Sequence, residues 1–81
     1  MQNNQVNEQV SEQVLKNRNN VIEMCITRKT AKEIRTQLKI KSHNYVSENI
    51  IKPLIAEGLI DYTNKKNINA SNQKYVTIKK P

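Results

Sequence analysis

The stretch from Ser42 to Gly58, SHNYVSENIIKPLIAEG, constrains the fold of this chain most. It opens with a serine, which favours the position just before a helix, and closes with the only glycine of the sequence. Its aliphatic side chains recur at a spacing that places them on one face of a helix. Pro53 disturbs this pattern, because proline has no N–H to donate to the carbonyl of Asn49. We therefore predict one helix here, with a kink or a tightened turn near residues 51–53.

Two more helices are predicted before this stretch, over about residues 11–27 and 30–38. The second opens with Thr30-Ala31-Lys32-Glu33, a capping box in which the threonine and glutamate side chains each bond a backbone amide of the other residue. Two runs of strand-forming residues, 59–63 and 74–78, follow the long helix and enclose a polar loop. Three helices followed by a two-stranded β-wing form a winged helix-turn-helix. The predicted fold class is therefore α+β, mainly α, with this architecture.

We divide the chain into a flexible or partly helical N-terminal extension, residues 1–10, and a winged-helix domain, residues 11–81. Gln-Val pairs recur every four residues at Gln5-Val6, Gln9-Val10 and Gln13-Val14. This repeat fits a helical extension, a dimer seam or a frayed linker, and its spacing leaves all three open. The helix over 11–27 is expected to bury one broad face, made of Val14, Val21, Ile22, Cys25 and Ile26.

The charge balance points to a polyanionic partner. Fourteen Lys and Arg residues against seven Asp and Glu residues give a net charge of +7. The basic residues concentrate in two segments, Arg28–Lys41 and Lys65–Lys80, on either side of the long helix in the sequence. We favour nucleic acid over a membrane surface, because no strongly amphipathic basic helix flanks an anchor. Charge alone also fits a protein with a solvated basic surface and no such partner.

The sequence offers little for catalysis or metal binding. The single cysteine, Cys25, and the single histidine, His43, fall on different predicted helices, which argues against a shared metal site. Ser42 beside His43 is a helix cap and a first-turn residue, not a nucleophile and its base. One glycine in the whole chain provides no glycine-rich loop for a nucleotide phosphate. We expect no enzyme activity, cofactor, metal or small-molecule substrate.

The expected location is cytoplasmic, and nucleoid-associated if the protein binds DNA. No run of residues is long enough to span a membrane, and the N-terminus lacks the pattern of a signal peptide. One cysteine allows no internal disulfide, and Cys25 is expected to be a buried, inert thiol.

Two sets of residues are predicted to contact double-stranded DNA. The first turns of helix 42–57 would enter the major groove, where the amide of Asn44 or Asn49 matches the edge of adenine. The wing over 64–73 and the second helix would hold the backbone. The helix set is Ser42, His43, Asn44, Tyr45, Glu48, Asn49 and Lys52. The wing and backbone set is Thr30, Lys32, Arg35, Lys41, Lys65, Lys66, Asn67, Asn69 and Lys74.

Four side chains in or near these sets have interpretations that compete with DNA contact. For Glu48, a surface ion pair with Lys52 is favoured over a bond to cytosine. Tyr45 either bonds a phosphate or lies at the half-buried edge of the core. Gln73 and Tyr75 are expected to be structural and to close the base of the wing.

The segment from Pro53 to Tyr75 also resembles a known family. Pro53-Leu54-Ile55-Ala56-Glu57-Gly58-Leu59-Ile60-Asp61-Tyr62-Thr63, followed by a gap and then Gln73-Lys74-Tyr75, is similar to bacterial winged-helix domains. These occur at the C-terminal end of Fic-type AMP-transferases and in ATP-binding putative transcriptional regulators. The repeated Gln-Val pairs resemble the start of that family's pattern, so the resemblance covers about residues 5–78. It implies a winged helix that binds DNA in a bacterial transcriptional regulator, or in the DNA-binding part of one.

The chain departs from the family pattern in two places. Residues 65–71 lack the two prolines and the Ser-Arg pair of the family's wing, although they remain basic. Helix 42–57 carries Ser47 and Glu48, where the family is often richer in Arg and Lys. Glu48 in the helix and the repeated Gln-Val pairs of the N-terminus favour an alternative, a protein-interaction or homodimerisation module without specific DNA binding. Binding of RNA or of nucleic-acid ends also fits the charge, but the chain has only three aromatic residues, all tyrosines.

Overall fold

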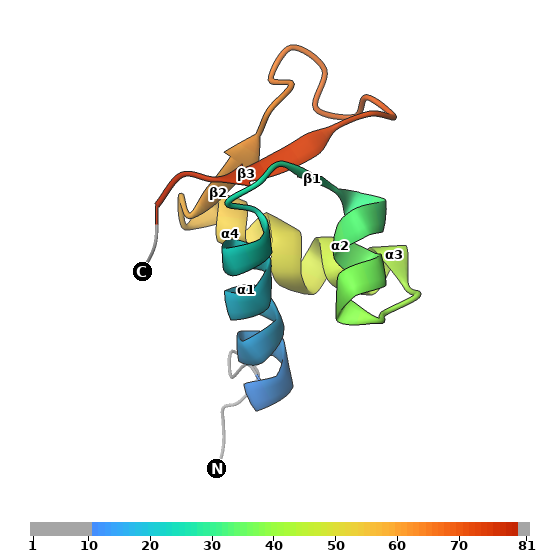
Figure 1. The fold of residues 1–81 in the computed structure, drawn as a ribbon, viewed down its shortest axis with the longest axis vertical. Helices are drawn as coiled ribbons and strands as arrows, with labels where there is room; N and C mark the ends of the chain where they lie inside the picture. Colours follow the sequence, from blue (N-terminus) through green and yellow to red (C-terminus); the bar gives the residue numbers. More distant parts are fainter. Residues whose placement is uncertain (1–10, 80–81) are drawn as a thin grey trace.

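The computed structural model describes residues 11–79 and shows a small α+β domain (Figure 1). Three helical stretches lie on one face of a three-stranded antiparallel sheet. The α+β class is therefore confirmed, while the predicted extension over 1–10 lies outside the described residues. In chain order the elements are α1 (Glu12–Met24), β1 (Lys29–Thr30), α2 (Ala31–Leu38), α3 (His43–Val46), the π-helical segment η1 (Ser47–Ile51), α4 (Lys52–Ala56), β2 (Ile60–Tyr62) and β3 (Lys74–Thr77).

Helix α1 begins directly after its cap, Ser11, whose hydroxyl accepts a 3.2 Å hydrogen bond from the amide of Val14. It continues through the run of poor helix formers at residues 17–20. Four of the five side chains predicted for its apolar face are buried, but Ile26 is 55% exposed. That part of the prediction is wrong, because α1 ends at Met24 and Ile26 lies beyond the last turn.

Helix α2 has the predicted capping box. The Thr30 hydroxyl accepts from the Glu33 amide at 3.1 Å, and the Glu33 carboxylate accepts from the Thr30 amide at 2.8 Å. Ile34 is fully buried, and Ala31 and Leu38 pack against the same core. The helix ends at Lys39, whose φ of 61° is in the left-handed region.

Segments α3, η1 and α4 follow one another without a break, and we call them the long helix, His43–Ala56. The effect of Pro53 differs from the prediction of a kink or a tightened turn: the helix is widened into a π-helical segment just before the proline. There the Lys52 amide bonds the carbonyl of Ser47, five residues back. The carbonyl of Asn49, for which Pro53 has no donor, accepts instead from Arg18 Nε at 3.0 Å. Helix α1 therefore supplies the bond that the proline removes.

Gly58 ends the long helix in the left-handed conformation, with φ of 76°. Its amide bonds the carbonyl of Ile55 at 2.9 Å, and the Leu59 amide bonds the carbonyl of Leu54 at 3.0 Å. This pair of bonds is the Schellman arrangement, which turns the chain out of the helix and into β2.

The sheet has three strands in the order β1-β3-β2, not the two predicted. The extra strand, β1, pairs Lys29 with Tyr75 and Thr30 with Lys74. On the other side of β3, Tyr62 of β2 also faces Tyr75. Thr77 fixes β3 to α1, because its amide bonds the Cys25 carbonyl at 2.8 Å and its hydroxyl bonds the Ile22 carbonyl at 2.6 Å.

One aliphatic core joins the helices to the sheet. It lies between α1, α2, the long helix and β2, and it includes no aromatic side chain among its fully buried members. Its buried residues are Val14, Val21, Ile22, Cys25, Ile34, Val46, Ile50, Ile51, Leu54 and Ile60. Within residues 11–79, no helix is both long enough and apolar enough to cross a membrane.

Candidate nucleic-acid interface

A groove of about 560 Å³ lies where the long helix, the start of α2 and the sheet meet the β2–β3 loop, residues 63–73. In Figure 1 this loop, in orange, extends beyond the sheet toward the end where α2 begins. We call the hollow the basic groove. It is lined by Thr30, Ala31, Lys32, Arg35, His43, Ser47, Ile51, Lys52, Tyr62, Ile68, Asn69, Ala70, Ser71, Gln73 and Tyr75.

The groove brings together six residues that were predicted to contact DNA. They come from α2 and its cap, from the long helix and from the loop, so the fold alone makes them neighbours. No carboxylate is among the lining residues, whereas three side chains that are positively charged at neutral pH are. The six are Thr30, Lys32, Arg35, His43, Lys52 and Asn69.

Arg35 is the only one of the three groove cations that is partly buried. Its Nη1 donates to the Lys41 carbonyl across a long 3.4 Å contact, and its Nε is buried without a hydrogen-bond partner. An unmet buried donor costs about 1–3 kcal/mol, so an acceptor that reached Arg35 Nε would gain a favourable bond. Lys41 itself is exposed and does not line the groove.

The long helix offers two different polar faces. His43, Ser47 and Lys52 line the groove. Asn44 and Glu48 are exposed on the adjoining face, outside the groove.

Three predicted contacts of the helix set are partly committed to the protein itself. Ser42 caps the helix, since its hydroxyl accepts from the Tyr45 amide at 3.1 Å. Tyr45 is half-buried and packs on the core, which is the core-edge position weighed for it. The side-chain Nδ2 of Asn49 donates to the Tyr45 carbonyl at 3.1 Å, which uses one of its two N–H donors.

Glu48 forms the predicted ion pair with Lys52, with a 2.7 Å contact from Nζ to Oε2. The hydrogen bond from the ammonium group and the charge of Glu48 together raise the pKa of Lys52 above its usual value. Both side chains are about three-fifths exposed, so solvent screens the pair and its contribution to stability is small. Its main consequence is electrostatic, because it places a negative charge beside the groove.

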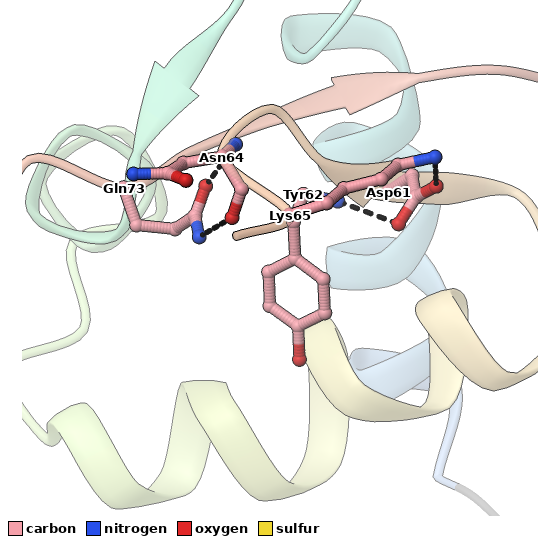
Figure 2. Close-up of polar contacts among 5 residues, drawn as sticks. All are labelled: Asp61, Tyr62, Asn64, Lys65 and Gln73. Atoms are coloured by element: carbon pink, nitrogen blue, oxygen red, sulfur yellow. Dashed lines mark hydrogen bonds and ion pairs between the residues drawn. The ribbon is translucent and has the colours of Figure 1, made fainter. Parts of the chain in front are cut away.

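Gln73 organises the β2–β3 loop (Figure 2). It is only 6% exposed, although its side chain is fully polar. Its Oε1 accepts from the amides of Asn64 at 2.9 Å and Lys74 at 3.1 Å. Its Nε2 donates to the carbonyls of Asn64 at 2.8 Å, Ile68 at 3.1 Å and Asn67 at 3.3 Å. The prediction that Gln73 is structural and closes this loop is confirmed.

The predicted cations of the loop are not equivalent. Lys65 forms a 2.9 Å ion pair with Asp61, whose pKa is lowered by Lys65 and by the Tyr62 amide (Figure 2). Lys66 and Lys74 are exposed and form no side-chain ion pair within residues 11–79. None of these three lysines lines the groove.

Asn67 has a local structural role and also lies outside the groove. Its Oδ1 accepts from the Asn69 amide at 3.2 Å, and its own amide donates to Asn64 Oδ1 at 3.2 Å. These short-range bonds shape the turn that carries Asn69 into the groove wall.

The sequence reasoning missed the aromatic wall of the groove. Tyr62 and Tyr75 are direct partners across β2 and β3, so their side chains share one face of the sheet. Their ring centroids are 5.6 Å apart, with the planes tilted by 46°. Alternation along each strand shows which side chains share a face with each tyrosine. That Tyr62 and Tyr75 are neighbours follows only from the register between the two strands.

Neither Cys25 nor a metal-binding cluster is part of the basic groove within residues 11–79. Cys25 is buried, as predicted, and burial raises the pKa of its thiol to about 11, so the thiol is protonated at neutral pH. The described part of the chain contains no group of three or more His, Cys, Asp or Glu side chains suited to hold a metal ion.

Comparison of the chain with protein-family models, with curated proteins and with solved structures found no match.

Proposed function

We propose that this domain is a winged helix that binds double-stranded DNA and serves as a transcriptional regulator or as the DNA-binding part of one. The observation that carries the proposal is the basic groove, where Lys32, Arg35 and Lys52 converge from two helices with no carboxylate in the lining. Lys52 is paired with Glu48 beside the groove, whereas Lys32 and Arg35 form no ion pair within residues 11–79. Convergent cations of this kind are the electrostatic footprint expected for a polyanion. We infer a binding module, not an enzyme.

In this proposal the long helix lies in the major groove and the β2–β3 loop lies on the backbone. Asn44, exposed on the helix beside the basic groove, faces the bases, whereas Glu48 stays paired with Lys52. Lys32, at the first turn of α2, and Lys66, in the loop, contact phosphates on either side. The wing is the loop that Gln73 holds in shape, and β1 is an addition to the two-stranded wing.

The test is fluorescence anisotropy with labelled mixed-sequence and A/T-rich duplexes, titrated at several salt concentrations. Wild-type affinity should fall steeply as salt rises, because each neutralised phosphate contributes a slope of about −0.9 to a log–log plot. Lys32→Ala/Lys66→Ala should weaken binding and reduce that slope by about two. Lys16→Ala/Lys79→Ala removes the same charge from exposed positions outside both the groove and the β2–β3 loop and should leave the slope nearly unchanged. No binding at low salt, or equal losses in both variants, would contradict the proposal.

A protein-interaction or homodimerisation module is the second candidate, and a separate observation favours it. Ile26 and Ile78 are 55% and 57% exposed, and neither lines the basic groove. Their neighbours Cys25 and Thr77 are hydrogen-bonded to each other, which places the two isoleucines near one another. Sedimentation of the wild type and of Ile26→Ser/Ile78→Ser distinguishes the two functions. A mass that rises with concentration and is lost in the variant would support dimerisation.

A further inference from the structure

We propose that the basic groove binds one unpaired nucleotide, with its base against Tyr62 and its phosphate against Lys32 and Arg35. The proposal goes beyond duplex binding, and it holds whether or not the long helix reads DNA. It starts from the aromatic wall. Figure 2 shows the Tyr62 ring projecting from β2 toward the helices. Tyr62 is only half-buried there and lines the groove.

A half-buried aromatic ring in a groove can stack on the face of a base, and a duplex does not present such a face. Bases within a duplex are stacked on one another, so a protein groove contacts only their edges or the backbone. An unpaired base has a free face, and stacking on tyrosine is how proteins hold single strands. Tyr75 lines the same groove beside Tyr62, with the ring centroids 5.6 Å apart and the planes tilted by 46°.

The rest of the groove suits the other parts of a nucleotide. Lys32 and Arg35 come from α2 and His43 comes from the long helix, all three in the wall of the same groove as Tyr62. Ser47 of the long helix and Ser71 of the β2–β3 loop add hydroxyls that can bond a base edge or a sugar. A volume of about 560 Å³ falls within the range of small-molecule sites.

Two sources of this ligand are possible, a nucleotide within a single strand and a free mononucleotide, and they share the same chemistry. The experiment therefore has three arms: anisotropy of labelled oligo-dT, competition by unlabelled AMP, and anisotropy of a blunt duplex. We expect oligo-dT to bind the wild type. Competition by AMP would identify a mononucleotide site, and its absence would identify a strand site.

Tyr62→Leu keeps an apolar side chain against Tyr75 but removes the stacking surface. It should weaken oligo-dT binding at least about fivefold, and by a larger factor than it weakens duplex binding. Tyr62→Phe keeps the ring and should bind oligo-dT nearly as the wild type does. Far-ultraviolet circular dichroism and thermal melting verify that both variants fold.

A measurement on the wild type makes the test independent of variant folding. With ring-labelled tyrosine, oligo-dT should shift the NMR resonances of Tyr62 upfield, since a stacked base shields the ring, and should leave those of Tyr45 in place. Absence of oligo-dT binding, an unchanged affinity in folded Tyr62→Leu, or unshifted Tyr62 resonances would overturn the proposal. Loss of duplex binding with oligo-dT binding intact would refute only the duplex function.

Discussion

Replacement of Gln73 should destabilise the domain far more than its place in a surface loop suggests. Gln73→Met keeps the length of the side chain but removes five hydrogen bonds to the loop backbone, at 2.8–3.3 Å. A typical buried hydrogen bond contributes about 0.5–1.5 kcal/mol net. Water can reach part of this loop and replace some of the lost bonds, so we expect a loss of about 2–3 kcal/mol in the free energy of unfolding. For a domain of this size that corresponds to roughly 10–20 °C in Tm.

The control for Gln73→Met is Asn72→Met, the same loss of an amide at the adjacent, exposed position. Urea unfolding followed by circular dichroism should separate the two variants by about 2 kcal/mol or more. Amide hydrogen exchange at Asn64 and Lys74, whose N–H groups bond the Gln73 side chain, should accelerate only in Gln73→Met. A difference below about 0.5 kcal/mol between the variants would refute the view that Gln73 holds the loop.

Three further predictions concern the helices. Gly58→Ala should cost about 1–2 kcal/mol by urea unfolding, purely from backbone strain, because φ is 76° and nothing lies within 4 Å of an added Cβ. The pKa of Glu33 is lowered, chiefly by the Thr30 amide, so its contribution to stability is present above the usual carboxyl pKa and is lost as pH falls through the lowered value. In Glu33→Gln, Tm should therefore fall less than in the wild type as the pH is lowered. The same dependence of Tm on pH in both proteins would contradict a stabilising role of the Glu33 charge. Glu48→Gln should free Lys52 from its ion pair and strengthen duplex binding at low salt about two- to tenfold, whereas the exposed Glu57→Gln should have a smaller effect.

Local chemistry made several features predictable from the sequence. The capping box at Thr30 and the glycine end of the long helix each depend on a few adjacent residues, and both formed as predicted. The Glu48–Lys52 pair needs only helical spacing, and it is present. Gln73 was predicted to be structural from its place at the end of the loop, although its set of partners could not be listed beforehand.

Features that depend on distant partners were missed. Strand β1 has only two residues, too few for any alternation, and it exists because β3 lies beside it. The widened turn before Pro53 was not predicted, and the carbonyl that Pro53 leaves without a donor is satisfied by Arg18, thirty-one residues before Asn49. Ile26 fits the helical periodicity of the apolar face of α1, but the helix ends at Met24, before it reaches Ile26.

The net charge of +7 overstates the cations that are available to a polyanion. Lys52 is paired with Glu48 and Lys65 with Asp61, so a carboxylate partly offsets the charge of each of these two lysines, and Arg18 uses its Nε donor on the Asn49 carbonyl. Lys32 and Lys66 form no ion pair within residues 11–79, and Arg35 has a single long contact. If these three carry the phosphate contacts, the log–log salt slope is about −3, close to 0.9 for each cation. A measured slope steeper than about −6 would instead mean that the internal ion pairs open on binding, and that the loop and the long helix change their contacts when DNA arrives.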